Sequence, residues 1–199
     1  MLGYVVLPVI ALFLAILAAA AAAVVPAYFG TKVPGYSHVR HTISELGEAG
    51  SPVGAQVSHV GFVSIALLLW LFLLVAAQLV PEEAKDVLWM LALVGAGYFG
   101  GALFRCDPGA PAFGTWRNTF HNIFGSLEYI GALGAFSSLA RSSYWAPLSD
   151  VMAYAVPIVL VCFFGLTFPH RFRGLAQRVA ETIIFAGVVL LGIWVYRAS

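Results

Sequence analysis

Six long apolar stretches constrain the fold of this 199-residue chain more than any other feature. A bilayer span needs roughly 20 apolar residues, and lipid offers no hydrogen-bond partner to an unpaired backbone group. The sequence therefore predicts six membrane-spanning helices, at about Tyr4–Phe29, Val53–Val80, Val87–Phe104, Phe120–Leu139, Val151–Phe168 and Leu175–Tyr196. We expect one all-α transmembrane domain over residues 1–199, a bundle of six helices with a polar pocket at one membrane face.

The composition supports a membrane protein and excludes other classes. Only 10% of the residues are charged, against about 25% in soluble proteins, and the mean hydropathy is +0.93. The net charge is +1 and basic runs are absent from the sequence, which argues against a nucleic-acid partner and leaves membrane lipids as the expected partners. The apolar run Val5–Val25 is longer than the roughly 7–15 residues of a signal-peptide core, so we expect an uncleaved first helix.

Residues capable of chemistry lie at one end of the predicted bundle. In a six-span protein the first, third and fifth connections share one side of the membrane. Those connections and the adjoining helix ends contain His38, His41, Ser44, Glu45, His59, Asp107, His121, Glu128, His170, Arg171 and Arg173. The other end has only Glu82, Glu83, Lys85, Asp86, Arg141, Asp150 and Arg197. This asymmetry predicts a functional site on one face.

The first connection holds a dense polar segment at residues 38–47, His-Val-Arg-His-Thr-Ile-Ser-Glu-Leu-Gly. Ser44 is a candidate nucleophile, and Glu45 is a candidate general base or ligand. A helix cap is the alternative, because Thr42 or Ser44 is a good N-cap residue and the following glycine would end a short helix. Both interpretations remain open at this point.

The third connection and the fourth span supply a second group of candidates. Asp107 lies in an Asp-Pro-Gly turn beside Arg105, and His121 opens the fourth span. Glu128 follows seven residues later on the same helix face, and Gly125 leaves that face open between them. A carboxylate inside a span is costly and is a functional candidate by default. We therefore predict catalytic roles for Asp107, His121 and Glu128, the alternative being a hydrogen bond that locks the spans together.

Two further sets of residues are candidates for binding a metal ion or a substrate. His59, Asp107, His121 and His170 provide the ligand types of a zinc site, although none has a diagnostic spacing, so a divalent metal such as zinc is a candidate cofactor. Four arginines are candidates for holding an anionic head group, because guanidinium binds phosphate and carboxylate bidentately: Arg105, Arg117, Arg171 and Arg173. The alternative for the fifth connection is a basic loop that contacts anionic lipid.

Three smaller patterns complete the predictions. Arg178 and Glu181, at positions i and i+3, are expected to form an ion pair. The glycines of the third span spell a dinucleotide-type GxGxxG from Gly95 to Gly100, but without a preceding strand they indicate helix packing. Lysines and arginines number seven on the site face and three on the other, which predicts a cytoplasmic site face with both termini outside.

The segments His41-Thr-Ile-Ser-Glu-Leu-Gly47 and Phe104-Arg-Cys-Asp-Pro-Gly109, with the following His121, resemble a known family. It is the prokaryotic six-span membrane family labelled domain of unknown function 998 (DUF998). This resemblance covers essentially the whole chain and implies the fold, a prokaryotic cell-membrane location and a shared polar site, without an established activity. A looser similarity links Ser44, Asp107 and three histidines to the zinc hydrolases of the alkaline-ceramidase type, by residue type and membrane end only.

Three functional hypotheses follow. The first is a membrane-embedded hydrolase or head-group transferase that acts on a lipid-like substrate, with Glu128 orienting His121. The second is a lipid or small-molecule binding protein, transporter subunit or sensor without turnover. The third is a haem-binding electron carrier with His59 and His121 as axial ligands.

Overall fold

The structure, a computed structural model, describes residues 2–168 and 170–199. In chain order the elements are α1 (Leu2–Gly30), α2 (Ile43–Leu46), α3 (Gly54–Gln56), the π-helical turn η1 (Val57–Phe62), α4 (Val63–Ala76), the 3-10 turn η2 (Glu82–Ala84), α5 (Asp86–Leu103), α6 (Trp116–Arg141), α7 (Ala146–Thr167) and α8 (Arg173–Ala198). Because α3, η1 and α4 form one continuous span, the described residues contain six helices long and apolar enough to cross a membrane. The predicted all-α fold with six spans is confirmed.

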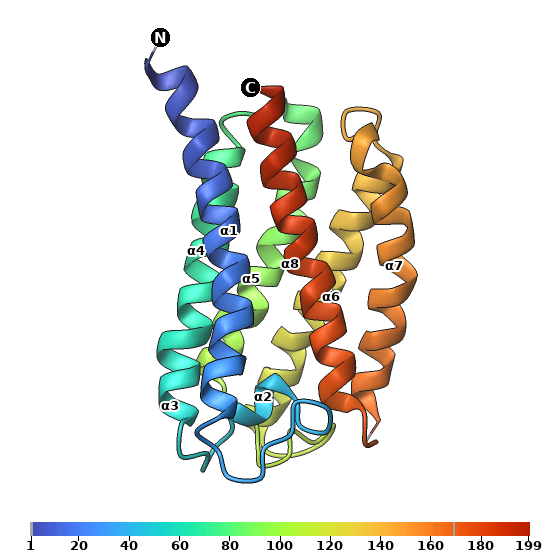
Figure 1. The fold of residues 1–199 in the computed structure, drawn as a ribbon. Helices are drawn as coiled ribbons and strands as arrows, with labels where there is room; N and C mark the ends of the chain where they lie inside the picture. The colour runs from blue at the N-terminus through green and yellow to red at the C-terminus, as the bar shows by residue number, and fades with distance from the viewer. Residues whose placement is uncertain (1, 169) are drawn as a thin grey trace.

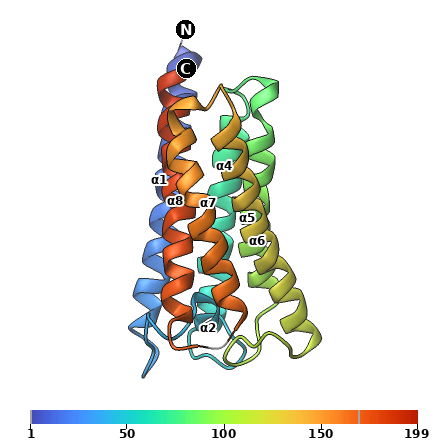
Figure 2. The same cartoon turned by 90° about the vertical axis from the view of Figure 1, so that its right-hand side faces the viewer.

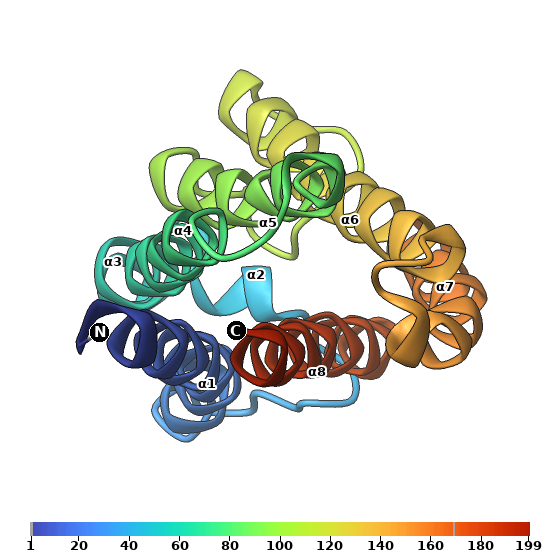
Figure 3. The ribbon, with the colours of Figure 1, turned by 90° about the horizontal axis from the view of Figure 1, so that it is seen from above.

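The six spans form a closed ring in chain order, in which α1 packs against both α4 and α8. The two chain ends lie at one end of the ring, and the first, third and fifth connections lie at the other (Figure 1). The short helix α2 belongs to that second end (Figure 2). Seen along the bundle axis, α2 crosses the middle of the ring (Figure 3). The elements that carry most of the polar residues therefore meet below the ring.

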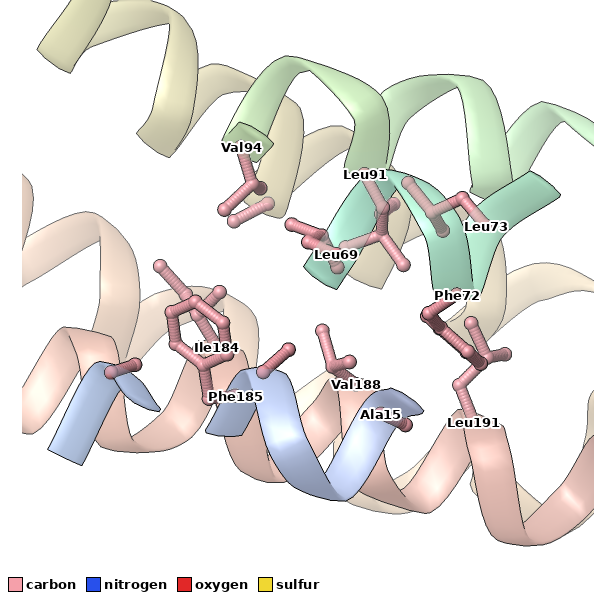
Figure 4. Packing of buried hydrophobic residues seen from close by; sticks show 14 of the residues in the cluster. Ala15, Leu69, Phe72, Leu73, Leu91, Val94, Ile184, Phe185, Val188 and Leu191 are labelled. Atoms are coloured by element: carbon pink, nitrogen blue, oxygen red, sulfur yellow. The ribbon is translucent and has the colours of Figure 1, made fainter. Parts of the chain in front are cut away.

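The ring is filled by apolar side chains in the half nearer the chain ends. Leu69 and Phe72 of α4 meet Leu91 of α5 and Leu191 of α8, and all four are fully or almost fully buried (Figure 4). The first helix contributes small residues to this core, since one face of its alanine tract is buried: Ala11, Ala15, Ala18 and Ala22. Small side chains let α1 approach α8 closely. The polar half of the ring interior is thereby confined to the other end.

Glycines of α5 allow it to lie directly against α6. A Cβ atom on Gly97 would overlap Cβ of Glu128 and would lie 2.9 Å from the carbonyl oxygen of Phe124. A Cβ on Gly100 would overlap the Phe124 ring. The glycine pattern of the third span is therefore a packing feature, as its context predicts. It also fixes the position of Glu128 against α5.

We expect Gly97→Ala to lower the free energy of unfolding by about 1–3 kcal/mol, because the added methyl group overpacks the α5–α6 contact. The measurement is thermal or denaturant unfolding of the protein in detergent. Gly125→Ala is the matched control, since a Cβ there meets nothing within 4 Å. That control should raise the stability by about 0.5–1 kcal/mol, the usual gain for alanine over glycine inside a helix. Equal effects of the two substitutions would contradict the close α5–α6 packing.

Candidate functional site

A cavity of about 240 Å³ lies inside the ring near the end formed by the first, third and fifth connections. Its walls come from α2, η1, α5, α6, α7 and α8, together with residues 110–112 of the third connection. The polar residues of the lining are Thr42, Ser44, Tyr98, His121, Asn122, Ser126, Glu128, Tyr129, Thr167, Arg173, Gln177 and Glu181. Four of these belong to the site predicted from the sequence.

Two helix faces give the cavity its depth. On α8, Arg173, Gln177 and Glu181 follow one another at intervals of four residues and all line the cavity. On α6, His121 and Glu128 lie two turns apart on one face. Both helices begin at the same end of the bundle (Figure 2). At 1.5 Å per residue, Glu181 lies about 12 Å further along the bundle than Arg173. We call the end near Arg173 and His121 the mouth, and the end near Glu128 and Glu181 the floor.

At the floor, Glu181 is held by two tyrosines. Tyr98 of α5 donates a hydrogen bond to Oε2 of Glu181 at 2.7 Å, and Tyr129 of α6 donates to Oε1 at 3.1 Å. Glu181 is only 5% exposed. Both of its oxygens thus accept from hydroxyl groups, which is the hydrogen bonding that stabilises a carboxylate.

Glu128 lies next to Glu181 and lacks such partners. It is 7% exposed, and its Oε1 atom is buried without a hydrogen-bond partner among the residues that the structure describes. The two carboxyl groups are close enough to interact electrostatically. The ion pair found in the described part of the chain, between Lys85 and Glu82, is at the opposite end of the bundle. Two adjacent buried carboxyl groups require a shared proton or a cation between them.

The tautomer of His121, which lines the cavity, is defined by a hydrogen bond of one ring nitrogen. Its Nδ1 atom lies 2.9 Å from the carbonyl oxygen of Phe104. A carbonyl oxygen only accepts, so Nδ1 carries the hydrogen and Nε2 of the neutral ring keeps its lone pair. Within residues 2–168 and 170–199, no hydrogen-bond partner of Nε2 is found. The imidazole is therefore oriented as a base.

The first connection is fastened to α8 beside the cavity mouth. Gln177 accepts the backbone N–H of Ile43 at 2.6 Å. Arg178 donates to the carbonyl of His41 at 2.9 Å and to the hydroxyl of Tyr36 at 2.6 Å, and that hydroxyl donates to the carbonyl of Thr42 at 2.8 Å. Burial raises the pKa of Tyr36 in spite of the opposing effect of the Arg178 charge. These bonds place α2 across the mouth.

Arg178 does not pair with Glu181, in contrast to the expectation from their spacing. Its guanidinium instead donates hydrogen bonds to groups of the first connection and to the carbonyl of Gly174. Its Nε donates to Nδ1 of His38 at 3.1 Å. Burial, followed by the positive charge of Arg178, lowers the pKa of His38. The i, i+3 pair is absent because both side chains have better-placed partners on other elements.

Glu45 and Ser44 are neighbours in α2 but have different structural roles. The helix-cap interpretation holds for Glu45: its Oε1 accepts the backbone N–H of Thr42 at 3.0 Å, and its own N–H donates to Thr42 Oγ1 at 3.3 Å. This reciprocal arrangement is a capping box. Glu45 does not line the cavity, so its predicted catalytic role is unsupported, whereas Ser44, one residue earlier, does line it.

Asp107 holds the third connection together. Its Oδ2 accepts the backbone N–H of Thr115 at 2.7 Å, and its Oδ1 accepts the Thr115 hydroxyl at 2.8 Å. The N–H of Asp107 donates to Asn118 at 3.1 Å. Asp107 is not part of the cavity lining. The structure thus gives Asp107 a role in the turn before α6, and its predicted catalytic role is unsupported.

The four arginines contact separate groups, so a head-group clamp formed by all four is unsupported. Arg105 donates to the carbonyl of Gly47 at 2.8 Å and to that of Glu48, and Arg173 donates to the carbonyls of Gly109 at 3.2 Å and Ala110 at 2.8 Å. The guanidinium groups of Arg117 and Arg171 lie over the neighbouring rings of Trp116 and Phe172, at 5.4 and 4.7 Å. Of the four, only Arg173 lines the cavity.

The proposed zinc ligands do not come together. Across residues 2–168 and 170–199 there is no group of three or more His, Cys, Asp or Glu residues that could hold a metal ion. His59 is exposed on η1, and His170 has its Nε2 at 2.8 Å from the carbonyl of Gly165. The ligand set of His59, Asp107, His121 and His170 is therefore not supported. The haem pair of His59 and His121 is likewise unsupported, because His59 is outside the cavity that contains His121.

Sequence reasoning missed Tyr98, Tyr129, Gln177 and Glu181 as cavity residues. A signal for two of them was present, since Arg173, Gln177 and Glu181 recur every four residues in an otherwise apolar span. The tyrosines carried no such signal, because a tyrosine in a span is as often an ordinary packing residue. Their role becomes visible only through their bonds to Glu181.

The fold and the cavity define a class: a polytopic membrane protein with a buried polar site near one end of a six-helix ring. The family comparison is more specific. The chain belongs to the family described as protein of unknown function (DUF998), which matches residues 16–194, as the sequence resemblance implies. No curated protein and no solved structure matches the chain.

We expect Arg105→Ala to loosen the first connection and expose Cys106. Burial raises the pKa of the Cys106 thiol to about 12, and its Sγ donates to the carbonyl of Ser44 at 3.4 Å, so the native thiol should resist alkylation at pH 8. Alkylation of a Cys162→Ser background, followed by mass spectrometry, measures this. Arg117→Ala is the control and should leave Cys106 protected. Fast alkylation in the control, or continued protection after Arg105→Ala, would contradict the structural role of Arg105.

Proposed function

We infer that the cavity receives the polar part of a lipid-like amphiphile and performs acid–base chemistry on it, either hydrolysis or head-group transfer. One observation carries this proposal. His121, with a free Nε2 atom, and Glu128, with an unpartnered oxygen, line the same cavity and lie two turns apart on one face of α6. A base and a buried carboxyl group on one wall of a cavity are the elements of such a site.

The proposed chemistry moves one proton from the attacking group to the leaving group through His121. Nε2 of His121 takes the proton of the attacking group, which is a water molecule or the Ser44 hydroxyl at the mouth. The carbonyl of Phe104 stabilises the imidazolium that forms, because it accepts the hydrogen on Nδ1. The imidazolium of His121 then gives this proton to the leaving oxygen, while Glu128 holds the substrate at the floor. The bond to the leaving group breaks as the bond to the attacking oxygen forms.

The walls support an amphiphilic substrate. Phe62, Phe163 and Leu166 line the cavity beside the polar groups. The cavity lies within a ring of helices that are long and apolar enough to span a bilayer. A substrate with a polar head and an apolar chain matches this lining. Apolar side chains and polar groups that line one cavity together are the usual form of a small-molecule site.

The test is lipid turnover by the purified protein in vesicles of a total lipid extract, followed by mass spectrometry. His121→Gln should reduce turnover by about 100-fold or more, the usual contribution of a general acid or base. His59→Gln, an exposed residue outside the cavity, is the matched control and should retain full turnover. Wild-type turnover by a folded His121→Gln protein would overturn the proposal.

Binding without turnover is the second candidate. It is favoured by one observation: in the described part of the chain, no hydroxyl or thiol group is hydrogen-bonded to His121 or Glu128, so no nucleophile is held in place. A binding protein, transporter subunit or sensor would need the cavity but not the acid–base step. Lipid that co-purifies at a fixed stoichiometry and is recovered chemically intact would support this candidate over the enzyme.

We also propose that the protein lies in a prokaryotic cell membrane with the cavity end in the cytoplasm. Seven basic residues at that end outnumber three at the other. Arg105, Arg173 and Arg178 donate hydrogen bonds to backbone carbonyls. Without these three, four basic residues at the cavity end still outnumber three at the other end.

The orientation is tested by single cysteines in a background without Cys106 and Cys162. Pro34→Cys reports on the first connection and Ser143→Cys on the fourth, and both positions are exposed and uncharged. An impermeant maleimide on intact cells should label Ser143→Cys alone. Both should react after the cells are permeabilised. The reverse pattern on intact cells would show that the cavity faces outward.

A further inference from the structure

We propose that the floor of the cavity binds a positively charged amine group of the ligand, an ammonium held between Glu128 and Glu181. This inference uses the same cavity and rests on the proposed function. It goes further because it names the chemical class of the ligand. The assignment depends on three independent features of the floor: its charge, its unpartnered oxygen and its aromatic walls.

The charge of the floor is uncompensated. Glu128 of α6 and Glu181 of α8 both line the cavity, and both are more than nine-tenths buried. Neither forms an ion pair with any described lysine or arginine. Arg173 is the one arginine in the lining, but its two Nη atoms donate to carbonyls at the mouth, about 12 Å from the floor by helix rise. Buried carboxyl groups without a cation are costly, and a bound ammonium removes that cost.

Among the described residues, one hydrogen-bond acceptor at the floor lacks a donor, and a ligand with N–H groups would supply it. The two oxygens of Glu181 already accept from Tyr98 and Tyr129. Oε1 of Glu128 is buried and has no partner among the described residues. An unpartnered buried polar atom costs about 1–3 kcal/mol. The N–H groups of an ammonium supply donors to both carboxyl groups at once.

The walls around the carboxyl groups are aromatic. Tyr129 stacks on Phe163 with ring centroids 5.1 Å apart, and Phe62 meets Tyr98 edge to face at 5.7 Å. All four rings line the cavity, and they come from four different elements. Aromatic faces attract cations within about 6 Å, and alkylammonium groups are the ligands that such walls recognise best.

The size of the cavity favours an organic cation over a bare ion. A volume of about 240 Å³ corresponds to roughly eight water molecules at about 30 Å³ each. A single metal ion would leave most of this space unfilled. An ammonium with an attached chain fills the floor with its charge and the apolar walls with its carbons.

The experiment compares amphiphiles that share one tail. Dodecylamine, dodecanol and dodecanoate are titrated, below their micellar concentrations, into protein in lipid nanodiscs, and binding is measured by calorimetry. We expect dodecylamine to bind at least 10-fold more tightly than dodecanol and dodecanoate to bind most weakly. Glu128→Gln should lower the dodecylamine affinity at least 10-fold and leave the dodecanol affinity unchanged, because it removes charge and keeps shape.

Two variants control for partition into the lipid and for misfolding. Glu83→Gln removes the same charge from an exposed site at the far end of the bundle and should change nothing. Gly125→Leu fills the cavity from a position where a Cβ meets no atom within 4 Å, so it should fold and abolish amine binding. Equal affinities for dodecylamine and dodecanol in the wild type, or an unchanged dodecylamine affinity in Glu128→Gln, would overturn the inference.

A separate arm of the same experiment asks whether the amine belongs to a lipid or to a small soluble molecule. Butylamine should compete with dodecylamine if the ligand is a small soluble amine, and should fail to compete if a lipid chain is required. The two proposals also fail separately. Loss of amine selectivity with turnover still dependent on His121 would remove this inference alone. Amine selectivity without any His121-dependent turnover would remove the acid–base function and leave an amine-binding protein.

Discussion

The lack of hydrogen-bond partners in lipid is the constraint on which the rest of this structure depends. Polar groups within the ring must find partners in the protein, or remain costly. Glu181 finds two, in the hydroxyl groups of Tyr98 and Tyr129, whereas one oxygen of Glu128 has none among residues 2–168 and 170–199. Because α5 has glycine at position 97, the Glu128 side chain is pressed against α5 and stays at the floor of the cavity. The contrast between these two carboxyl groups gives the site its chemistry.

The arginines near the cavity show how the same constraint acts at the membrane boundary. The first and third connections contain many backbone carbonyls outside regular helices, and arginine side chains satisfy several of them. Arg105 binds the first connection to the end of α5, Arg178 binds it to α8, and Arg173 binds the third connection. A guanidinium with several fixed donors is suited to this task. The loops are thereby organised around the mouth of the cavity, where the donors of these three arginines are used by backbone carbonyls.

The spans could be predicted from the sequence, because span formation depends on local hydropathy and length. The role of Gly97 followed from its apolar helical context. The site was predictable only in part. Ser44, His121, Glu128 and Arg173 line the cavity, but Glu45 and Asp107 cap or brace connections. Their roles depend on which backbone groups the folded loops bring near, and sequence spacing does not contain that information. Glu181 was missed because Arg178, three residues earlier, offered a local partner that the fold uses elsewhere.

The position of the carboxyl pair distinguishes the cavity from a simple packing defect. A gap between helices would be lined by apolar side chains and would stay dry. This cavity instead changes from Arg173 and His121 at the mouth to Glu128 and Glu181 at the floor, over about two helical turns on both α6 and α8. Two adjacent buried carboxyl groups oppose folding unless a proton or cation accompanies them. Such a pair suits a ligand with a positive charge, and it holds that charge at the floor about two helical turns from the base His121 at the mouth.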